Sequence, residues 1–527
     1  MSKENFIKQI SEGYNSENSL DLGAAMYQGE VQSNVLVKLP LKMFNRHGLI
    51  AGATGTGKTK TMQVIAEQLS QNGVPSMLID IKGDLSGLAM KGEEKDFIKE
   101  RHDKIGFGWE AMGSPVELMT ISTQKGVRLR ASVHEFGPIL FSKILGLNDT
   151  QTGIFSVIFK YCTENNLTLV DLNDVKEALK FAMSDEGNAT LAKEYGKISS
   201  SSVGVMLRQI AGLEEQGANR FFGEPSFEVP DLMKTDRYGK GMINILRVMD
   251  IQNKPKFFAT FMMQLLAEIY ETLPEEGDLD KPKFVMFIDE AHLIFDADTP
   301  KVLVEQLEVM VRLIRSKGVG IFFVTQNPAD IDDNVLGQLG LKVQHALRAF
   351  TAKDRKAIKA AAQNYPETEH YDVEELITSL GIGEALVTTL SEKGIPTPLV
   401  RTYLRAPQSR MDVLTDAEVD ELLGFSNLFS KYEKDVDPES AAEILGAKMA
   451  AYEEKQNEAE EQKEQEKLAK EQAKIDKARE KEEAKEAKEK GDVMGKVGKE
   501  VGKGFLNAAI GFGLRAAGVK TRRRKFF

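Results

Sequence analysis

The sequence predicts an α/β fold built on a mostly parallel β-sheet, and two observations carry this prediction. From residue 47 onward, short apolar runs such as "SMLIDI", "KFVMFID" and "GIFFVTQ" alternate with segments of helical period. Several of these runs are apolar almost throughout, which is typical of strands that are buried on both faces of a parallel sheet. At 527 residues and 42% hydrophobic composition, the chain is long enough for a large core and more than one domain.

The individual elements follow from these runs. Helices are expected at 59–71, 255–273 and 301–317, between the apolar runs. A further short strand is expected at 34–40, in "NVLVKLP". The main strands are expected at 47–52, 76–81, 116–122, 241–248, 283–289, 320–326, 343–349, 384–390 and 398–404.

Changes of composition along the chain predict its domains. The expected parts are a lead-in at 1–40, an α/β core at 41–131 and 236–410, a helical insertion at 132–235, a helical extension at 411–450, a charged helix or linker at 451–490 and a basic Gly-rich tail at 491–527. The charged segment consists almost only of Glu, Lys, Gln and Ala, with opposite charges four residues apart, which favours a solvated single helix. No apolar seam is sustained there, so a coiled coil is not expected.

Composition also limits the class of protein. With Cys162 as the one cysteine, the chain cannot form an internal disulfide, and a cysteine-based metal site is not expected. The N-terminus has no apolar core of a secretory signal, and no run of about 18 apolar residues occurs, so the expected compartment is the cytoplasm. The net charge of −11 argues against a uniformly basic nucleic-acid coat.

The stretch "GATGTGKT" predicts a phosphate-binding loop, because it follows an apolar strand and precedes a helix. Its glycines allow successive backbone N–H groups to turn toward phosphate oxygens, and the helix N-terminus adds positive potential. Lys58 would neutralise the β- and γ-phosphates, and the Thr59 hydroxyl would ligate Mg²⁺. The predicted nucleotide-binding residues are Gly52, Ala53, Thr54, Gly55, Thr56, Gly57, Lys58 and Thr59.

Two carboxylates follow the apolar run "KFVMFID" and complete a hydrolytic site. Asp289 lies at the carboxyl end of the expected strand, where ligands gather in open α/β sheets, and could hold Mg²⁺ through water. Glu290 follows it and is placed to orient and polarise an attacking water. We therefore expect ATP and Mg²⁺ as cofactors, with Glu290 as a catalytic residue.

Polar residues that follow two other strands are further candidates. Gln326 ends the next strand along the chain and could hydrogen-bond both the water and the γ-phosphate. Asp84, after the strand at 76–81, could face the nucleotide or could cap the following turn.

Three arginines are candidates for stabilising charge on the transferred phosphate. Arg312 and Arg315 share one face of the helix at 301–317 and could reach the γ-phosphate of a neighbouring subunit. Arg348 follows another strand and is an alternative. An ordinary solvated basic surface would explain any of the three equally well.

With these motifs in view, the chain resembles the HerA/FtsK superfamily of P-loop ATPases, and most closely its bacterial HerA-like helicase or ATPase branch. The resemblance covers roughly residues 20–410 and rests on "GATGTGKT", "LIDIKGDLSG", "FVMFIDEAH", "VRLIRSKGVGIFFVTQNPADI", "VQHALRAFT" and the helical insertion. It implies a RecA-like core, ATP with Mg²⁺, a homo-hexameric ring with composite sites and, for some members, translocation of duplex DNA.

The same resemblance implies roles for individual residues: Walker B residues Asp289 and Glu290, sensor Gln326 and arginine finger Arg315. Archaeal-type members carry an N-terminal β-barrel that docks a nuclease. Because only about 40 residues precede the loop here, a nuclease partner is not expected.

Two other functions fit parts of the sequence. "DEAH" at 289–292 suggests a two-lobed helicase, although no second lobe with its own arginine motif follows. The basic segment 491–527 suggests a nucleotide-dependent scaffold or switch at an anionic membrane surface. The same segment could instead contact DNA phosphates, or simply keep the chain soluble.

Overall fold

A computed structural model of the chain describes residues 2–277, 279–295, 299 and 301–500. Residues 1–449 form one compact unit, and the second unit begins at residue 450. The described residues of the first unit form a 12-stranded sheet in the order β2-β1-β12-β11-β10-β3-β9-β8-β4-β7-β5-β6. The strands are β1 (Ser19–Tyr27), β2 (Glu30–Pro40), β3 (Gly48–Ala51), β4 (Ser76–Asp80), β5 (Val116–Thr120), β6 (Val127–Arg128), β7 (Ile243–Arg247), β8 (Phe284–Ile288), β9 (Val319–Thr325), β10 (Leu341–Gln344), β11 (Glu384–Thr388) and β12 (Val400–Leu404).

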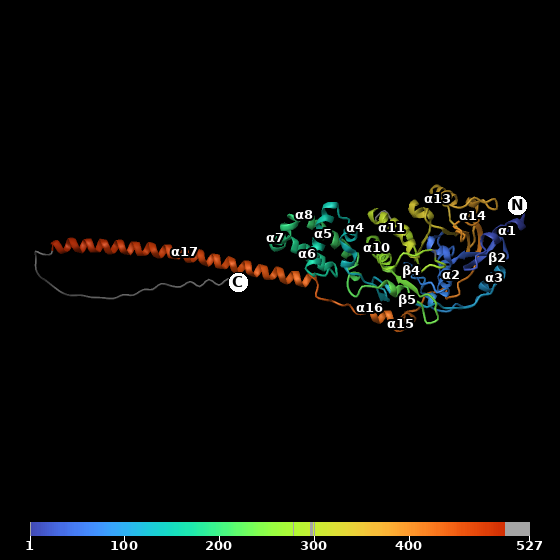
Figure 1. Ribbon diagram of the computed structural model, residues 1–527, viewed down its shortest axis with the longest axis horizontal. Helices are drawn as coiled ribbons and strands as arrows, with labels where there is room; N and C mark the ends of the chain where they lie inside the picture. Colours follow the sequence, from blue (N-terminus) through green and yellow to red (C-terminus); the bar gives the residue numbers. More distant parts are fainter. Residues whose placement is uncertain (1, 278, 296–298, 300, 501–527) are drawn as a thin grey trace. The chain divides into compact units, whose positions relative to one another are not determined.

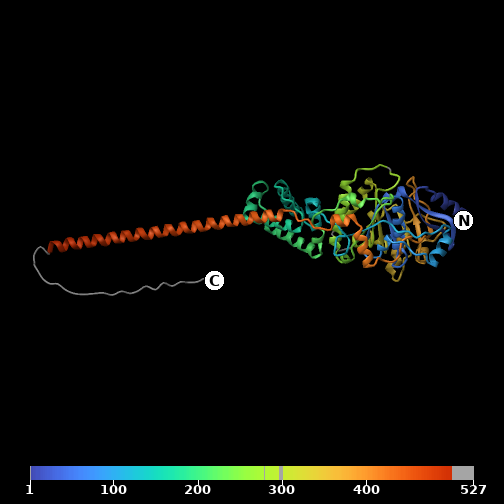
Figure 2. The ribbon, with the colours of Figure 1, turned by 90° about the horizontal axis from the view of Figure 1, so that it is seen from below.

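Helices cover both faces of the sheet and form the insertion, in which α5–α8 lie together at one end of the unit, away from β2 (Figure 1 and Figure 2). Short 3₁₀ turns connect several of the elements. The helices are α1 (Lys3–Gly13), α2 (Lys58–Gln71), α3 (Asp96–Ile105), α4 (Val133–Leu145), α5 (Asp149–Glu164), α6 (Leu172–Met183), α7 (Asp185–Tyr195), α8 (Ser200–Glu215), α9 (Val229–Leu232), α10 (Pro255–Thr272), α11 (Lys301–Ile314), α12 (Asp333–Leu336), α13 (Ala352–Gln363), α14 (Val373–Ser379), α15 (Asp416–Gly424), α16 (Asn427–Tyr432) and α17 (Ala441–Glu500).

The sheet confirms the predicted α/β fold class, because all pairs from β10 through β3 to β6 are parallel. Every residue of β3, β4, β8 and β9 is buried, which explains why these segments are apolar throughout. Adjacent residues of β3 enter different cores: Leu49 packs with the core that includes α10 and α11, and Ile50 with the core that includes α2.

The lead-in differs most from its expected form. Residues 19–40 form the hairpin β1–β2, and β1 pairs antiparallel with β12, so this segment extends the main sheet. The strand expected at 343–349 is also shorter, since β10 ends at Gln344. After it, the backbone leaves the sheet, and the Ala346 carbonyl accepts a hydrogen bond from Ala53 N–H of the phosphate loop, at 2.8 Å.

The residues after β12 connect the sheet to the insertion. Buried Glu67 of α2 accepts hydrogen bonds from the backbone N–H groups of Gln408 and Ser409, at 2.9 and 2.8 Å. Further on, buried Asp174 of α6 accepts from Ser440 Oγ and from Ala442 N, at 2.5 and 2.8 Å. The segment 405–442 is thus fixed at both ends by buried carboxylates.

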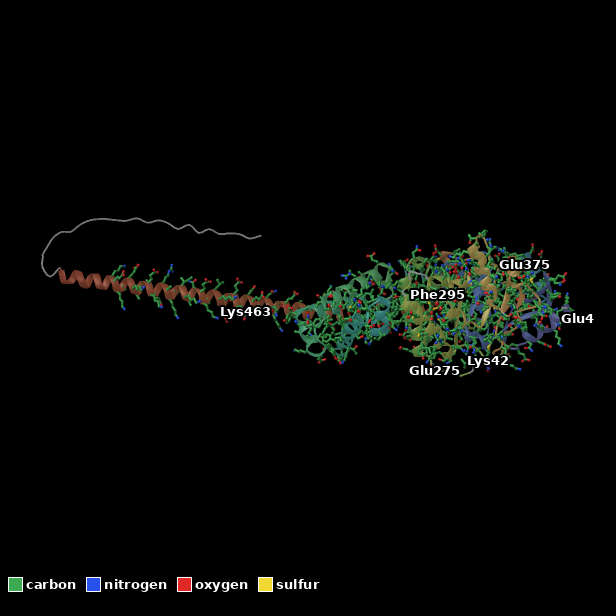
Figure 3. All side chains as sticks on the ribbon, turned by 90° about the horizontal axis from the view of Figure 1, so that it is seen from above. Glu4, Lys42, Glu275, Phe295, Glu375 and Lys463 are labelled. Atoms are coloured by element: carbon green, nitrogen blue, oxygen red, sulfur yellow. The ribbon has the colours of Figure 1, made fainter. Side chains whose placement is uncertain are left out.

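The second unit continues α17, and the side chains of residues 453–490 are exposed around the helix, as at Lys463 (Figure 3). The predicted charged helix at 451–490 lies within α17. Of the predicted basic tail at 491–527, the backbone of residues 491–500 is helical, and residues 501–527 lie outside the described part of the chain. Among the helices that the structure describes, none has the length and apolar character needed to span a bilayer.

Candidate active site

The phosphate-loop sequence connects the end of β3 to the start of α2, at the carboxyl edge of the parallel strands. Gly52 and Gly57 have φ angles of 155° and 112°, which side-chain-bearing residues rarely adopt. A Cβ at position 52 would also lie 2.4 Å from His345 Cβ. The first and last glycines of the motif are therefore required by the path of the backbone, whatever the ligand.

Lys58 is the first residue of α2, and its side chain folds back over the loop. Its Nζ donates hydrogen bonds to the carbonyl oxygens of Gly52 and Ala53, the latter at 3.3 Å. Burial, followed by the positive charge of Lys82, lowers the pKa of Lys58, and the carboxylates of Asp289 and Glu290 oppose this shift. The amine of Lys58 thus lies over the loop, close enough to the carboxylates of Asp289 and Glu290 to interact with their charges.

Asp289 follows β8 directly and is 1% exposed. Lys82, at the end of the neighbouring strand β4, places its Nζ 3.8 Å from Asp289 Oδ2. That oxygen accepts no hydrogen bond within the described residues. Burial raises the pKa of Asp289 to about 6. A buried carboxylate oxygen without a donor is suited to a hard cation such as Mg²⁺, so the residue fits the predicted metal role.

Glu290 has a left-handed backbone, with φ of 47°, which is unusual for a residue other than glycine. Its carboxylate forms an ion pair with Lys82 and lies 3.1 Å from His292 Nδ1. Gln326 Nε2 donates to both carboxylate oxygens, at 3.4 and 3.3 Å. Burial alone would raise the pKa of Glu290, but Lys82, with His292 and Gln326, holds it below its ordinary value, so the group is an ionised acceptor at neutral pH.

The fold thus brings Gln326 to Glu290, because β9 lies between β3 and β8 in the sheet. Lys82 is a contact that the sequence analysis gave no role. Its position directly after the apolar run at 76–81 could have indicated a site residue. Its pairing with Glu290 could not be predicted, because it depends on β4 being the neighbour of β8 in the sheet.

Asp84 was expected either to face the nucleotide or to cap the turn after β4, and its neighbour Asp80 helps to distinguish these two roles. Asp80 caps the turn, since its carboxylate accepts from the N–H groups of Gly83, Asp84 and Leu85, at 2.6, 3.2 and 3.2 Å. Asp84 Oδ1 is buried and accepts no hydrogen bond from the described residues. Burial lowers the pKa of Lys58 and Lys60, and the negative charge of Asp84 opposes this shift in both, so Asp84 lies on the side of the phosphate loop.

The three candidate arginines lie at opposite ends of the parallel strands: Arg348 is on the side of the phosphate loop, and Arg312 and Arg315 are at the other end. Arg348 lines a cavity of about 440 Å³ together with Ala53, Thr54 and Gln326, and it donates to the Thr378 carbonyl at 3.0 Å. Arg312 and Arg315 line a cavity of about 830 Å³ beside His47 and Gly340, which precede β3 and β10. Arg312 and Arg315 therefore lie near the beginning of β3, whereas the phosphate loop of the same chain follows the end of β3.

Arg46 and Lys342 line the same larger cavity as Arg312 and Arg315, so four cationic side chains share it. The sequence analysis missed these two residues. Arg46 lies two residues before β3, at the end of that strand opposite the phosphate loop. Only the parallel pairing of β3 with β9 brings it to the end of α11.

Comparison with known proteins agrees with the resemblance stated from the motifs. Residues 26–511 match the model of the family described as "Helicase HerA-like C-terminal". A DNA double-strand break repair helicase HerA of Sulfolobus acidocaldarius is 24% identical over 366 residues, which cover 68% of this chain and 65% of the relative. The protein of that description from Saccharolobus solfataricus is 21% identical, with 72% and 68% covered.

Among solved structures, the plasmid coupling protein TrwB in complex with a non-hydrolysable ATP analogue superposes with a TM-score of 0.49 at 15% identity, covering 79% of this chain and 96% of that one. The chain spans slightly less than two thirds of the Sulfolobus acidocaldarius relative. The phosphate loop, the acidic pair after β8 and the family match together identify the chain as a P-loop NTPase that belongs to the HerA-like helicase C-terminal family.

Proposed function

We propose that this protein hydrolyses ATP with Mg²⁺ and works as a ring-shaped motor on DNA. The observation that carries the proposal is the position of Glu290, an ionised carboxylate held by Lys82 and Gln326 at the same sheet edge as the phosphate loop. A water molecule between such a carboxylate and a γ-phosphate would be both oriented and polarised.

Each of the other residues then has a chemical task. Lys58 would exchange its hydrogen bonds to the Gly52 and Ala53 carbonyls for bonds to the β- and γ-phosphate oxygens. Gln326, already a donor to Glu290, would also reach the γ-phosphate. Asp289 and the Thr59 hydroxyl would hold Mg²⁺, which supplies positive charge to the phosphates.

A ring accounts for the position of the arginines. In a head-to-tail assembly, the edge with Arg46, Arg312 and Arg315 on one protomer would face the phosphate loop of the next. The site would then be completed only between subunits, and we propose a homo-hexamer. Arg348, which lines a cavity beside its own loop, would act within one protomer.

Mixing two inactive variants tests whether Arg315 acts on the nucleotide site of a neighbouring subunit. Arg315→Ala and Lys58→Ala should each lower turnover by a factor on the order of 10³ or more. When the two are mixed and reassembled, about one interface in four combines an intact loop with an intact arginine, so phosphate release should return in part.

Arg348→Ala provides the matched control, because a residue that acts within its own protomer cannot be replaced by a Lys58→Ala neighbour. Lys301→Ala, at the exposed start of α11, should keep full turnover by itself. No recovery in the Arg315 mixture, at concentrations where the wild-type protein is oligomeric, would contradict the role of Arg315 in trans.

The DNA part of the proposal rests on the relatives, which are described as DNA repair helicases. We expect duplex DNA to raise the ATP turnover of the oligomer several-fold, measured as phosphate release with and without DNA at fixed salt. Turnover that does not respond to DNA, but responds to anionic vesicles, would instead favour a nucleotide-dependent switch at a membrane surface.

A further inference from the structure

A short turn beside the phosphate loop has a feature that hydrolysis does not explain. The turn Gly381–Gly383 precedes β11 and carries Ile382, whose side chain is 72% exposed. The Gly383 N–H donates to the Thr56 carbonyl of the loop, at 3.1 Å. A large apolar side chain thus points into solvent from a backbone that is hydrogen-bonded to the nucleotide-binding segment.

The turn is held rigidly by Arg101 of α3. The guanidinium donates to the carbonyl oxygens of Ile382, Gly383 and Leu404, at 3.2, 3.1 and 2.9 Å, and lies 4.1 Å from the centre of the Tyr403 ring. Position 383 also requires glycine, since its φ is 72° and a Cβ there would lie 2.9 Å from the guanidinium. Such rigidity is expected of a surface that contacts a ligand, because little order is lost when the ligand binds.

The order of the strands indicates which part of a nucleotide would reach this turn. Part of the sheet has the strand order β11-β10-β3-β9-β8, and the phosphate loop follows β3. The carboxylates of Asp289 and Glu290 follow β8, which is two strands to one side of β3. Because β11 runs antiparallel to β10, its first residue, Glu384, lies at the same edge two strands to the other side. A nucleotide with its γ-phosphate directed toward Glu290 would place its sugar and base on the opposite side of the loop, toward β10 and β11, where Gly57 lies next to Gly383.

We propose that Ile382 packs against the purine base of the bound nucleotide, and that Arg101 positions the turn for this contact. The inference rests on the proposed ATP binding and assigns the base-contacting surface of that site. An aliphatic side chain covers either purine, so this contact supplies affinity for the base and leaves the choice between adenine and guanine to other groups.

Ligands with and without a base test the proposal. ADP and inorganic pyrophosphate, each with Mg²⁺, are titrated calorimetrically into wild-type and Ile382→Ala protein. The variant should bind ADP about five- to tenfold more weakly, from the loss of apolar contact, and should bind pyrophosphate like the wild type. Ile382→Leu should keep the ADP affinity within about twofold.

Ile395 offers a matched control, because it is 61% exposed in the β11–β12 connection, at the other end of β11. Ile395→Ala should leave both affinities unchanged. Equal weakening of ADP and pyrophosphate by Ile382→Ala, or no weakening of either, would overturn the contact with the base. Wild-type protein that binds neither ligand would instead overturn the proposed function, and the inference with it.

Discussion

Glu290→Gln is expected to slow ATP hydrolysis by about 10²- to 10³-fold, because the amide cannot accept a proton from the attacking water. Glutamine has nearly the same shape and lies within reach of Lys82 and Gln326, so the loop and its phosphate contacts should persist. Nucleotide binding should therefore be kept. The rate is measured as phosphate release in a single turnover, and binding is measured separately with labelled ATP.

Glu305→Gln is the control for this variant, because Glu305 is an exposed carboxylate on α11. It should hydrolyse ATP at the wild-type rate. Normal hydrolysis by Glu290→Gln would show that another group orients the water, and it would contradict the catalytic role of Glu290.

Lys58→Ala is expected to weaken ATP binding by roughly 100-fold, which corresponds to about 2–3 kcal/mol for the loss of charge-assisted hydrogen bonds to phosphate. Turnover should fall below detection. Equilibrium binding of labelled ATP measures the effect.

Lys60 is the matched lysine, two residues further along α2, and its Nζ donates to the Met411 carbonyl at 2.6 Å. Lys60→Ala should bind ATP within about threefold of wild type, since the side chain is directed to the segment after β12. If Lys58→Ala and Lys60→Ala weakened binding equally, a general loss of positive charge at α2 would explain both, and the specific role of Lys58 would be refuted.

The parts of the fold that sequence predicts best are those where burial leaves a plain pattern. Strands β3, β4, β8 and β9 are covered on both faces, so their sequences are apolar throughout and their ends are marked by polar residues such as Asp289. The loop between β3 and α2 is likewise predictable, because its glycines are required by backbone geometry as much as by phosphate.

Contacts that depend on the order of strands could not be predicted in this way. Lys82 reaches Glu290 only because β4 lies beside β8, and these strands are about 200 residues apart in the sequence. Arg46 and Arg315 share a cavity for the same kind of reason. The strand expected at 34–40 lies within β2, but strand β1 was not predicted, because it adds to the sheet beside β12, which follows nearly 400 residues later.

The most direct test of the account is the rate of phosphate release by the purified protein, followed over a range of protein concentrations with ATP, with and without Mg²⁺. We expect release that requires the metal, that rises more steeply than the protein concentration as subunits complete one another's sites, and that Lys58→Ala abolishes. If the wild-type protein neither retains nor cleaves ATP at any concentration, a hydrolytic site formed by the loop at 52–59 and Glu290 is ruled out.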